Sequence, residues 1–101
     1  MSITTNRKNE GSTLEIHIDG RFDFSSHQAF RDAYEDADQN VETYVVDMKN
    51  TTYLDSSALG MLLLLRDYAG GDSANVTLAN CNDDVRRILT ISNFEQLFEI
   101  R

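Results

Sequence analysis

The sequence predicts an α/β fold, in which a mixed β-sheet of about five strands carries helices packed mainly on one face. Along the chain, hydrophobic positions recur alternately every two and every ~3.6 residues, as they do where strands alternate with helices. The chain has 101 residues, 41% of them hydrophobic and 26% charged, which suits one modest core without disulfides or metals. No proline, internal repeat or low-complexity tract divides it. We therefore expect a single domain over residues 1–101.

Five segments predict the strands. Ile3 and Thr5 indicate a weak edge strand, and a turn at Gly11-Ser12 joins it to a second strand as a hairpin. That second strand is amphipathic, because polar residues alternate with Leu14, Ile16 and Ile18. Tyr44–Met48 has little polar alternation, which is typical of a central strand. Short strands are expected at Val76–Ala79 and Phe98–Ile100, and Lys49–Leu54 is expected to be a polar loop.

Three helices are predicted between these strands. The first is capped by Ser25 or Ser26 and places Ala29, Phe30, Ala33, Tyr34 and Ala37 on its buried stripe, opposite a solvated stripe of Arg31, Asp32, Glu35 and Asp38. The second begins at Ser56 or Ser57, runs to Ala69 and ends at Gly70-Gly71. The third is capped by Asn82, carries Asp83 and Asp84 in its first turn and buries Val85, Ile88 and Leu89.

Charge and composition narrow the classes of function. The net charge of −8 argues against nucleic-acid binding, which depends on Lys and Arg, and favours a basic or amphipathic protein partner. The single cysteine, Cys81, has no internal disulfide partner, and the polar start Met1–Gly11 does not resemble a signal peptide. The longest apolar run, Ala58–Leu65, is far shorter than the ~20 residues that span a membrane. We expect a cytoplasmic protein without membrane contact.

The segment Asp55-Ser56-Ser57 places two hydroxyls at the start of a helix. The first N–H groups of a helix lack intrahelical partners and carry partial positive charge, so a serine there is well placed to meet another protein or to carry a phosphate. The same triplet is also typical of a plain helix cap. Ser57 is expected to be a second hydrogen-bonding residue of the helix terminus. The triplet alone leaves both interpretations open.

Other chemistry has less support. His17 and His27 do not form a catalytic arrangement with Ser56, because there is no Gly-x-Ser-x-Gly elbow and no recognisable oxyanion loop, so we expect no enzyme. The acids Asp36, Asp38, Asp83 and Asp84 are spread over separate elements without metal-binding spacing, and neither a metal nor a cofactor is expected. Asp47 ends a central strand as the acceptor of a phospho-receiver domain does, yet no paired acids follow the first strand to hold magnesium.

Four motifs taken together resemble a known family. They are the Gly-x-Phe-Asp turn at Gly20–Asp23, the strand Val45-Val46-Asp47, the segment Tyr53–Gly60 and the helix Val85–Leu89. In this order they are similar to the bacterial STAS domain, specifically the anti-sigma factor antagonists, over nearly the whole chain. The resemblance implies that Ser56 is the phosphorylation site. The chain departs from the family at Ala58, where the family usually has glycine. Alanine is still small and favours a helix.

The resemblance also implies partners. The unphosphorylated protein would bind an anti-sigma factor that is also a GHKL-type serine kinase and so free a sigma factor, phosphorylation of Ser56 would abolish binding, and a PP2C-type phosphatase would restore it. Together with the pattern of the helix that follows Asp55, the resemblance predicts that Asp23, Asp55, Ser56, Ser57, Ala58, Leu62 and Arg66 bind the partner. Because a sheet covers only one side of a helix, Ala58 and Leu62 are candidates for exposure, unless neighbouring helices cover them. The alternative is a non-switching STAS subunit of a transporter or sensory assembly, in which Ser56 is structural.

Overall fold

A computed structural model describes residues 2–35 and 41–101 as a six-stranded mixed sheet with three α-helices. The strands are β1 (Ser2–Lys8), β2 (Thr13–Phe22), β3 (Thr43–Asp47), β4 (Thr51–Leu54), β5 (Val76–Ala79) and β6 (Glu99–Ile100). The helices are α1 (His27–Glu35), α2 (Ser56–Tyr68) and α3 (Asp83–Ile91). The predicted α/β class is confirmed.

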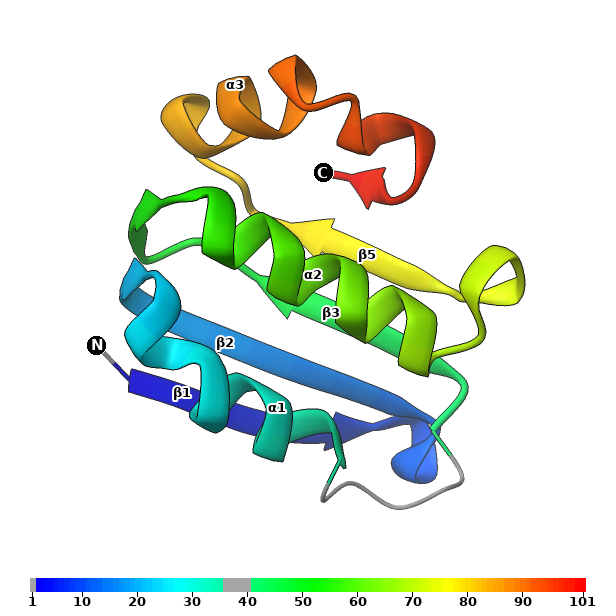
Figure 1. The fold of residues 1–101 in the computed structure, drawn as a ribbon. Coiled ribbons are helices and arrows are strands. Elements are labelled where there is room, and N and C mark those ends of the chain that lie inside the picture. The colour runs from blue at the N-terminus through cyan, green and yellow to red at the C-terminus, as the bar shows by residue number, and fades with distance from the viewer. Residues whose placement is uncertain (1, 36–40) are drawn as a thin grey trace.

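The sheet has the order β1-β2-β3-β5-β6, and β4 pairs with the far end of β2. β1 and β2 form the expected antiparallel hairpin, and all other pairings are parallel. Figure 1 shows α1 and α2 lying side by side against one face of the sheet, while α3 lies beyond α2 on the side of β5. The predicted arrangement, with helices mainly on one face, follows from these parallel crossovers.

The core lies between this face and the helices. In β2 the residues Leu14, Ile16 and Ile18 are buried, while the intervening Glu15 and His17 lie half-buried on the other face, so the predicted alternation is confirmed. The helices contribute the fully or nearly fully buried side chains Phe30, Tyr34, Met61, Leu62, Leu65, Val85 and Leu89. Each such side chain stabilises the fold by about 1.5–3 kcal/mol relative to an exposed one.

The expectation that Lys49–Leu54 forms a polar loop is wrong for most of its length, because Thr51–Leu54 form β4. Thr51 and Leu54 are buried, and the Thr51 hydroxyl donates a hydrogen bond to the Ile18 carbonyl at 2.9 Å. A strand of four residues with buried ends and exposed middle residues has no alternation to reveal it.

The start of the first helix also differs from the prediction. Asp23, not a serine, caps a 3₁₀ turn at Phe24–Ser26 that leads directly into α1. Ser26 is buried and its hydroxyl contacts the Arg21 carbonyl at 3.3 Å. On the predicted buried stripe Phe30 and Tyr34 are buried, whereas Ala29 is exposed. Ala37 and the acids Asp36 and Asp38 lie outside the described residues.

The other helix termini follow the sequence closely. α2 begins at Ser56, as predicted, with Asp55 as its cap, and the two glycines after it both have positive φ, 125° at Gly70 and 61° at Gly71. Asn82 caps α3 as predicted, with its side-chain oxygen accepting the Val85 N–H at 2.9 Å. Over residues 2–35 and 41–101, the helices are all too short or too polar to traverse a lipid bilayer.

Candidate functional site

Two acidic residues follow β2 and β4 at the end of the sheet where both strands terminate. These strands run parallel, and Phe22 pairs with Leu54 in their register. Each strand is followed at once by an aspartate, Asp23 after β2 and Asp55 after β4. Because neighbouring parallel strands end at the same edge, the register brings the two aspartates to one edge of the sheet. Each of them caps the helical segment that follows it.

Asp55 fixes the start of α2. Its Oδ1 accepts a hydrogen bond from the Ala58 N–H at 2.9 Å, while its carbonyl accepts the Leu59 N–H at 3.2 Å. Ser56 follows as the first helical residue and is exposed, and Ser57 is partly buried. The Ser56 hydroxyl therefore stands at the positive end of α2, where solvent and a second protein can reach it.

Asp23 is held as a charged group. The Ser25 hydroxyl and the Ser25 N–H, the latter at 3.0 Å, both donate to its Oδ1, and the Arg21 guanidinium lies 3.4 Å from its Oδ2. The hydrogen bond from the Ser25 hydroxyl is the largest cause that lowers the pKa of Asp23 below its usual value of 3.8, against a smaller opposing effect of desolvation. A fixed negative charge thus lies on the loop beside the α2 terminus.

Sequence reasoning missed a cation–aromatic pair at the same edge. Arg21 and Tyr53 are cross-strand neighbours in β2 and β4, and the Arg21 guanidinium lies 4.2 Å from the centre of the Tyr53 ring. Both side chains are exposed, because the residues after them, Phe22 and Leu54, are the ones that point into the core. Only the register of β4 against β2 reveals this pair, so nothing in the sequence pattern could have indicated it.

The expected exposure of Ala58 and Leu62 is wrong, since both have 0% exposed surface. They lie on the same side of α2 as Met61 and Leu65, at the spacing of a core-facing stripe. The exposed leucines of the apolar run are Leu63, at 41%, and Leu64, at 52%. Ala58 and Leu62 therefore pack in the core, and Leu63 and Leu64 are the leucines of this run that α2 exposes to solvent.

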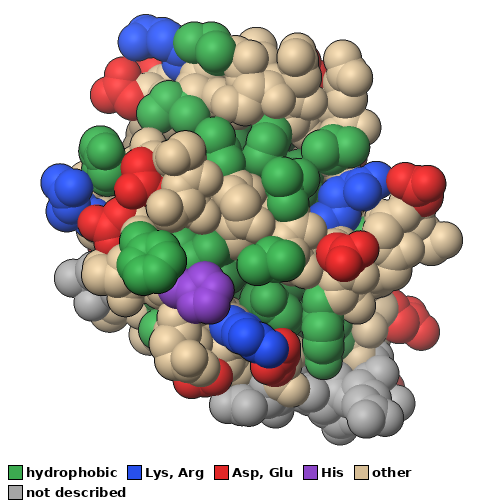
Figure 2. Space-filling model, viewed as in Figure 1, with side chains coloured by type: hydrophobic (Ala, Val, Ile, Leu, Met, Phe, Trp, Pro, Cys, Tyr) green, Lys and Arg blue, Asp and Glu red, His purple; other side chains and the backbone are tan. Residues whose placement is uncertain are grey.

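The outer surface of α2 continues from Ser56 toward these leucines. Gly60 lies one turn after Ser56, and a Cβ at Gly60 would meet nothing within 4 Å. Leu63 and Leu64 follow one turn later, and the 3₁₀ turn with Phe24, 72% exposed, contacts α2. We call Phe24, Ser56, Gly60, Leu63 and Leu64 the α2 face. In Figure 2 apolar side chains gather over α2 and its neighbours on this side of the molecule.

Arg66, also predicted to contact a partner, is tied down within the domain. Its Nε donates to the Leu97 carbonyl at 3.3 Å and its Nη2 contacts Asp72 at 3.1 Å. These contacts join the end of α2 to the turn before β5 and to the segment before β6. The guanidinium remains partly exposed, and its contact with a partner stays a prediction.

The histidines stand apart from one another. His17 lies on the open face of the sheet, 3.3 Å from Glu15 and 3.5 Å from Asp47, whereas His27 stacks on Phe24 with ring centres 5.9 Å apart.

Asp47, which the sequence compared with the phospho-acceptor of a receiver domain, accepts hydrogen bonds from the Lys49 N–H and the Asn80 amide, so both of its carboxylate oxygens have partners. Within the ranges 2–35 and 41–101, no group of acids, histidines and cysteine is arranged to hold a metal ion.

Fold and site together define a small mixed α/β domain that presents a serine at the start of a helix, beside two helix-capping aspartates. The chain belongs to the STAS domain family, because the family model described as "Mlab, STAS domain" matches residues 5–99. Its fold is that of anti-sigma factor antagonists such as SpoIIAA.

Individual relatives agree with this assignment. The STAS-domain containing protein PA14_20770 of Pseudomonas aeruginosa (strain UCBPP-PA14) is 62% identical over 100 residues, which cover 99% of each chain. The structure of the Thermotoga maritima protein TM1081 matches with a TM-score of 0.84 at 13% identity, over 97% of this chain and 84% of that one. SpoIIAA matches in its unphosphorylated form with a TM-score of 0.72 at 15% identity, over 99% of this chain and 87% of that one. The phosphorylated form of SpoIIAA, a Bacillus protein, matches at 0.67 and 16% identity, over 99% of this chain and 91% of that one.

Proposed function

We propose that this protein is an anti-sigma factor antagonist controlled by phosphorylation of Ser56. In the unmodified state it binds an anti-sigma factor that is also a GHKL-type serine kinase, in the cytoplasm, and a sigma factor is released. Phosphorylation by that kinase ends the binding, and a PP2C-type phosphatase restores it. The observation that carries the proposal is the exposed Ser56 at the first position of α2, next to the capping carboxylate of Asp55. The protein itself needs no catalytic group for this role.

The α2 face supplies the affinity in the unmodified state. Phe24, Leu63 and Leu64 expose between 41% and 72% of their surface, so a partner that covers them gains apolar burial. Gly60 allows the partner's backbone to approach α2 closely. The net charge of −8 favours a partner with a basic rim, which also speeds association.

A phosphate on Ser56 changes the charge of this contact without requiring a change of fold. It brings about −1.5 to −2 charges at neutral pH. The α2 terminus stabilises such a group by only about 0.3–1 kcal/mol. A partner carboxylate at ~4 Å opposes it by about 4 kcal/mol per charge pair at an effective dielectric near 20. That opposition is about a thousandfold in affinity.

Phosphorylation with the cognate kinase tests the proposal directly. The purified protein is incubated with ATP and the kinase, and the modified residue is located by mass spectrometry. We expect a phosphate on Ser56, none on the Ser56→Ala variant, and an unchanged result for Ser57→Ala, which is the matched control on the neighbouring hydroxyl. Phosphate on Asp47, or none at all, contradicts the proposal.

Binding is measured separately from modification. The wild type and Ser56→Ala are expected to capture the anti-sigma factor in a pull-down, whereas Ser56→Asp is expected to lose most of the binding. Equal capture by Ser56→Ala and Ser56→Asp refutes the switch.

A second candidate is a non-switching STAS subunit of a transporter or sensory assembly. It is favoured by the hydrogen bond from the Ala58 N–H to Asp55, since that bond gives the Asp-Ser segment a structural role without any phosphate. In that case the kinase leaves Ser56 unmodified, and Ser56→Ala and Ser56→Asp both remain bound to the assembly.

A further inference from the structure

β1 is an edge strand with one side of its backbone unpaired. It pairs with β2 along all of Ser2–Lys8, and among residues 2–35 and 41–101 no strand pairs with its other edge. In Figure 1 β1 lies at the border of the sheet, with α1 in front of it. An exposed edge of this length offers its N–H and C=O groups to another strand.

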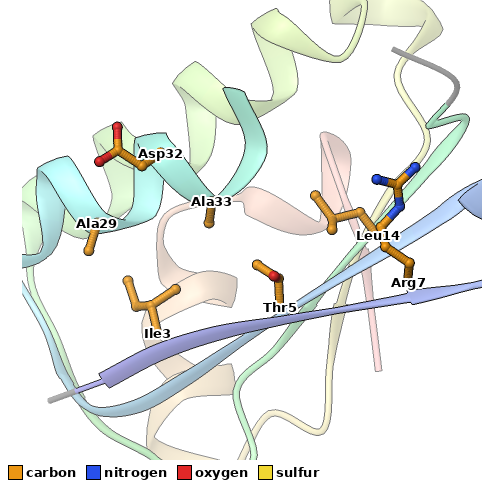
Figure 3. Close-up of a pocket in the computed structure, with 7 residues that line it drawn as sticks. All are labelled: Ile3, Thr5, Arg7, Leu14, Ala29, Asp32 and Ala33. Carbon is orange, nitrogen blue, oxygen red and sulfur yellow. The ribbon is translucent and has the colours of Figure 1, made fainter. Parts of the chain in front are cut away.

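An open groove of about 420 Å³ runs between β1 and α1 (Figure 3). Ile3, Thr5 and Leu14 form its floor, and α1 contributes the small side chains of Ala29 and Ala33, which point down toward β1. The exposed Ala29, which the sequence placed on the buried stripe, thus belongs to this groove. Of the apolar side chains that line the groove, Leu14 is buried in the core, whereas Ile3 and Ala33 are only partly buried.

The groove has opposite charges at its two ends. Arg7 lies at one end, where its Nη2 and Nε donate to the Gly11 carbonyl at 2.6 and 3.2 Å. This contact positions the guanidinium and leaves further N–H donors for a second acceptor. Asp32 lies on α1 toward the end near Ile3, and its Oδ1 accepts from the Gln28 amide at 2.8 Å.

We propose that β1 pairs with β1 of a second copy of this chain, antiparallel about a two-fold axis at Thr5. This axis is perpendicular to the sheet, so the helix-covered faces of both copies lie on the same side of the extended sheet. Side chains of paired residues then point to the same face, which pairs odd-numbered residues with odd-numbered residues. Among the registers that satisfy this condition, only the one centred on Thr5 pairs all seven residues of Ser2–Lys8. The pairing is independent of the proposed phosphorylation.

Charge complementarity selects a second copy as the occupant. In this register Arg7 lies opposite Ile3 of the second copy, at the end of the groove that carries Asp32. The aliphatic stem of Arg7 then covers Ile3, its guanidinium approaches Asp32, and the symmetry forms the same contact twice. Lys8 lies opposite Ser2, so no two like charges meet in the strand pair.

The dimer leaves the α2 face open. In Figure 1 α1 lies in front of β1 and beside α2, and the open edge of β1 lies at the border of the sheet farthest from β5, so the second copy adds to the sheet on the side away from Ser56. Because the axis runs through the sheet from face to face, both α2 faces lie on the same side of one continuous sheet. Two sites presented together allow a partner with two subunits to bind with higher avidity than one site gives.

Sedimentation velocity on the full chain tests the proposal. At ~0.15 M salt, where screening over about 8 Å limits the repulsion between two chains of charge −8, we expect the mass to rise from 11.5 kDa toward twice that value with concentration. Arg7→Glu and Asp32→Arg each weaken dimerisation about tenfold, since each replaces two ion pairs with two like-charge contacts. The double variant Arg7→Glu with Asp32→Arg restores it.

Two controls keep the test decisive. Arg87→Glu changes the same charge on α3, where Arg87 contacts Asp84 at 3.7 Å, and leaves dimerisation unchanged. Because Arg7 also supports the turn at Gly11, Thr5→Lys serves as a second variant: Thr5 is exposed, and the change places two cations face to face on the axis. Circular dichroism checks that each variant is folded.

Several results overturn the proposal. A chain that stays monomeric up to ~1 mM excludes β1 pairing. A dimer whose affinity is unchanged by both charge reversals and by Thr5→Lys also excludes it. Hydrogen exchange gives the last decision. Protection of the outer β1 amides only after a different protein is added assigns this edge to a strand of that protein instead.

Discussion

Leu62 and Leu63 are neighbours on α2 that differ in burial, and exchanging each for alanine separates the stability of the domain from its binding. Leu62 is 0% exposed and lies in the core, whereas Leu63 is 41% exposed on the α2 face. Leu62→Ala removes buried methyl groups and leaves a cavity, which costs about 2–5 kcal/mol. Leu63→Ala removes the same atoms from a surface position, where the free energy of unfolding changes by about 0.5 kcal/mol or less.

Both variants are unfolded with urea and followed by circular dichroism, and both are tested for capture of the anti-sigma factor. For a domain of this size each 1 kcal/mol lowers the melting temperature by about 4–8 °C, so the two variants are well separated in stability. Leu63→Ala is expected to keep its stability and to lose affinity, because its exposed side chain belongs to the surface that we propose for the partner. Equal destabilisation by the two changes refutes the burial assigned to α2, and unchanged capture by Leu63→Ala refutes the α2 face.

Three further predictions concern caps and titrating groups. Asp55→Ala removes the hydrogen bond to the Ala58 N–H and lowers the free energy of unfolding by about 1 kcal/mol, whereas Asp55→Asn retains most of it; urea unfolding measures both. The folded-state pKa of Asp23 lies below 3.8, so its stabilisation is present above that pH and is lost as the pH falls through the folded-state value; Asp23→Asn is expected to unfold less steeply with acid, and an unchanged acid limb contradicts this. Burial raises the pKa of the Cys81 thiol above 9.0, so an alkylating reagent at pH 8 is expected to modify the native protein more slowly than the urea-unfolded one; equal rates exclude a protected thiol.

The parts of the fold that the sequence predicted are those with a clear period or a strong terminus. β2 shows strict alternation, and α3 combines an Asn82 cap with a regular apolar stripe, so the sequence alone predicts both. The sequence does not predict β4, because this four-residue strand is specified by its pairing with β2 and not by its own pattern. Local sequence therefore predicts elements that stabilise themselves, and it misses those that depend on a distant partner.

The orientation of α2 illustrates the same limit at the site. Five consecutive apolar residues, Met61–Leu65, show no preferred face, because each direction around the helix is occupied by an apolar side chain. Which of them are buried depends on the orientation of α2 against the sheet. That orientation is set by β4, which pairs with β2 and leads directly to the Asp55 cap of α2. The sequence thus predicts that this run is partly buried and partly exposed, but it assigns the exposed position to Leu62 instead of Leu63 and Leu64.

Asp55 links the fold to the proposed switch. Its carboxylate is occupied by the Ala58 N–H, so the helix start stays closed whether or not Ser56 carries a phosphate, and the phosphate would meet a terminus that is already capped. In the switch that we propose, the partner then detects the modification as added charge and bulk, and not as an unfolded helix. Under that proposal the protein returns to its binding state as soon as the phosphate is removed, because no part of α2 has to refold.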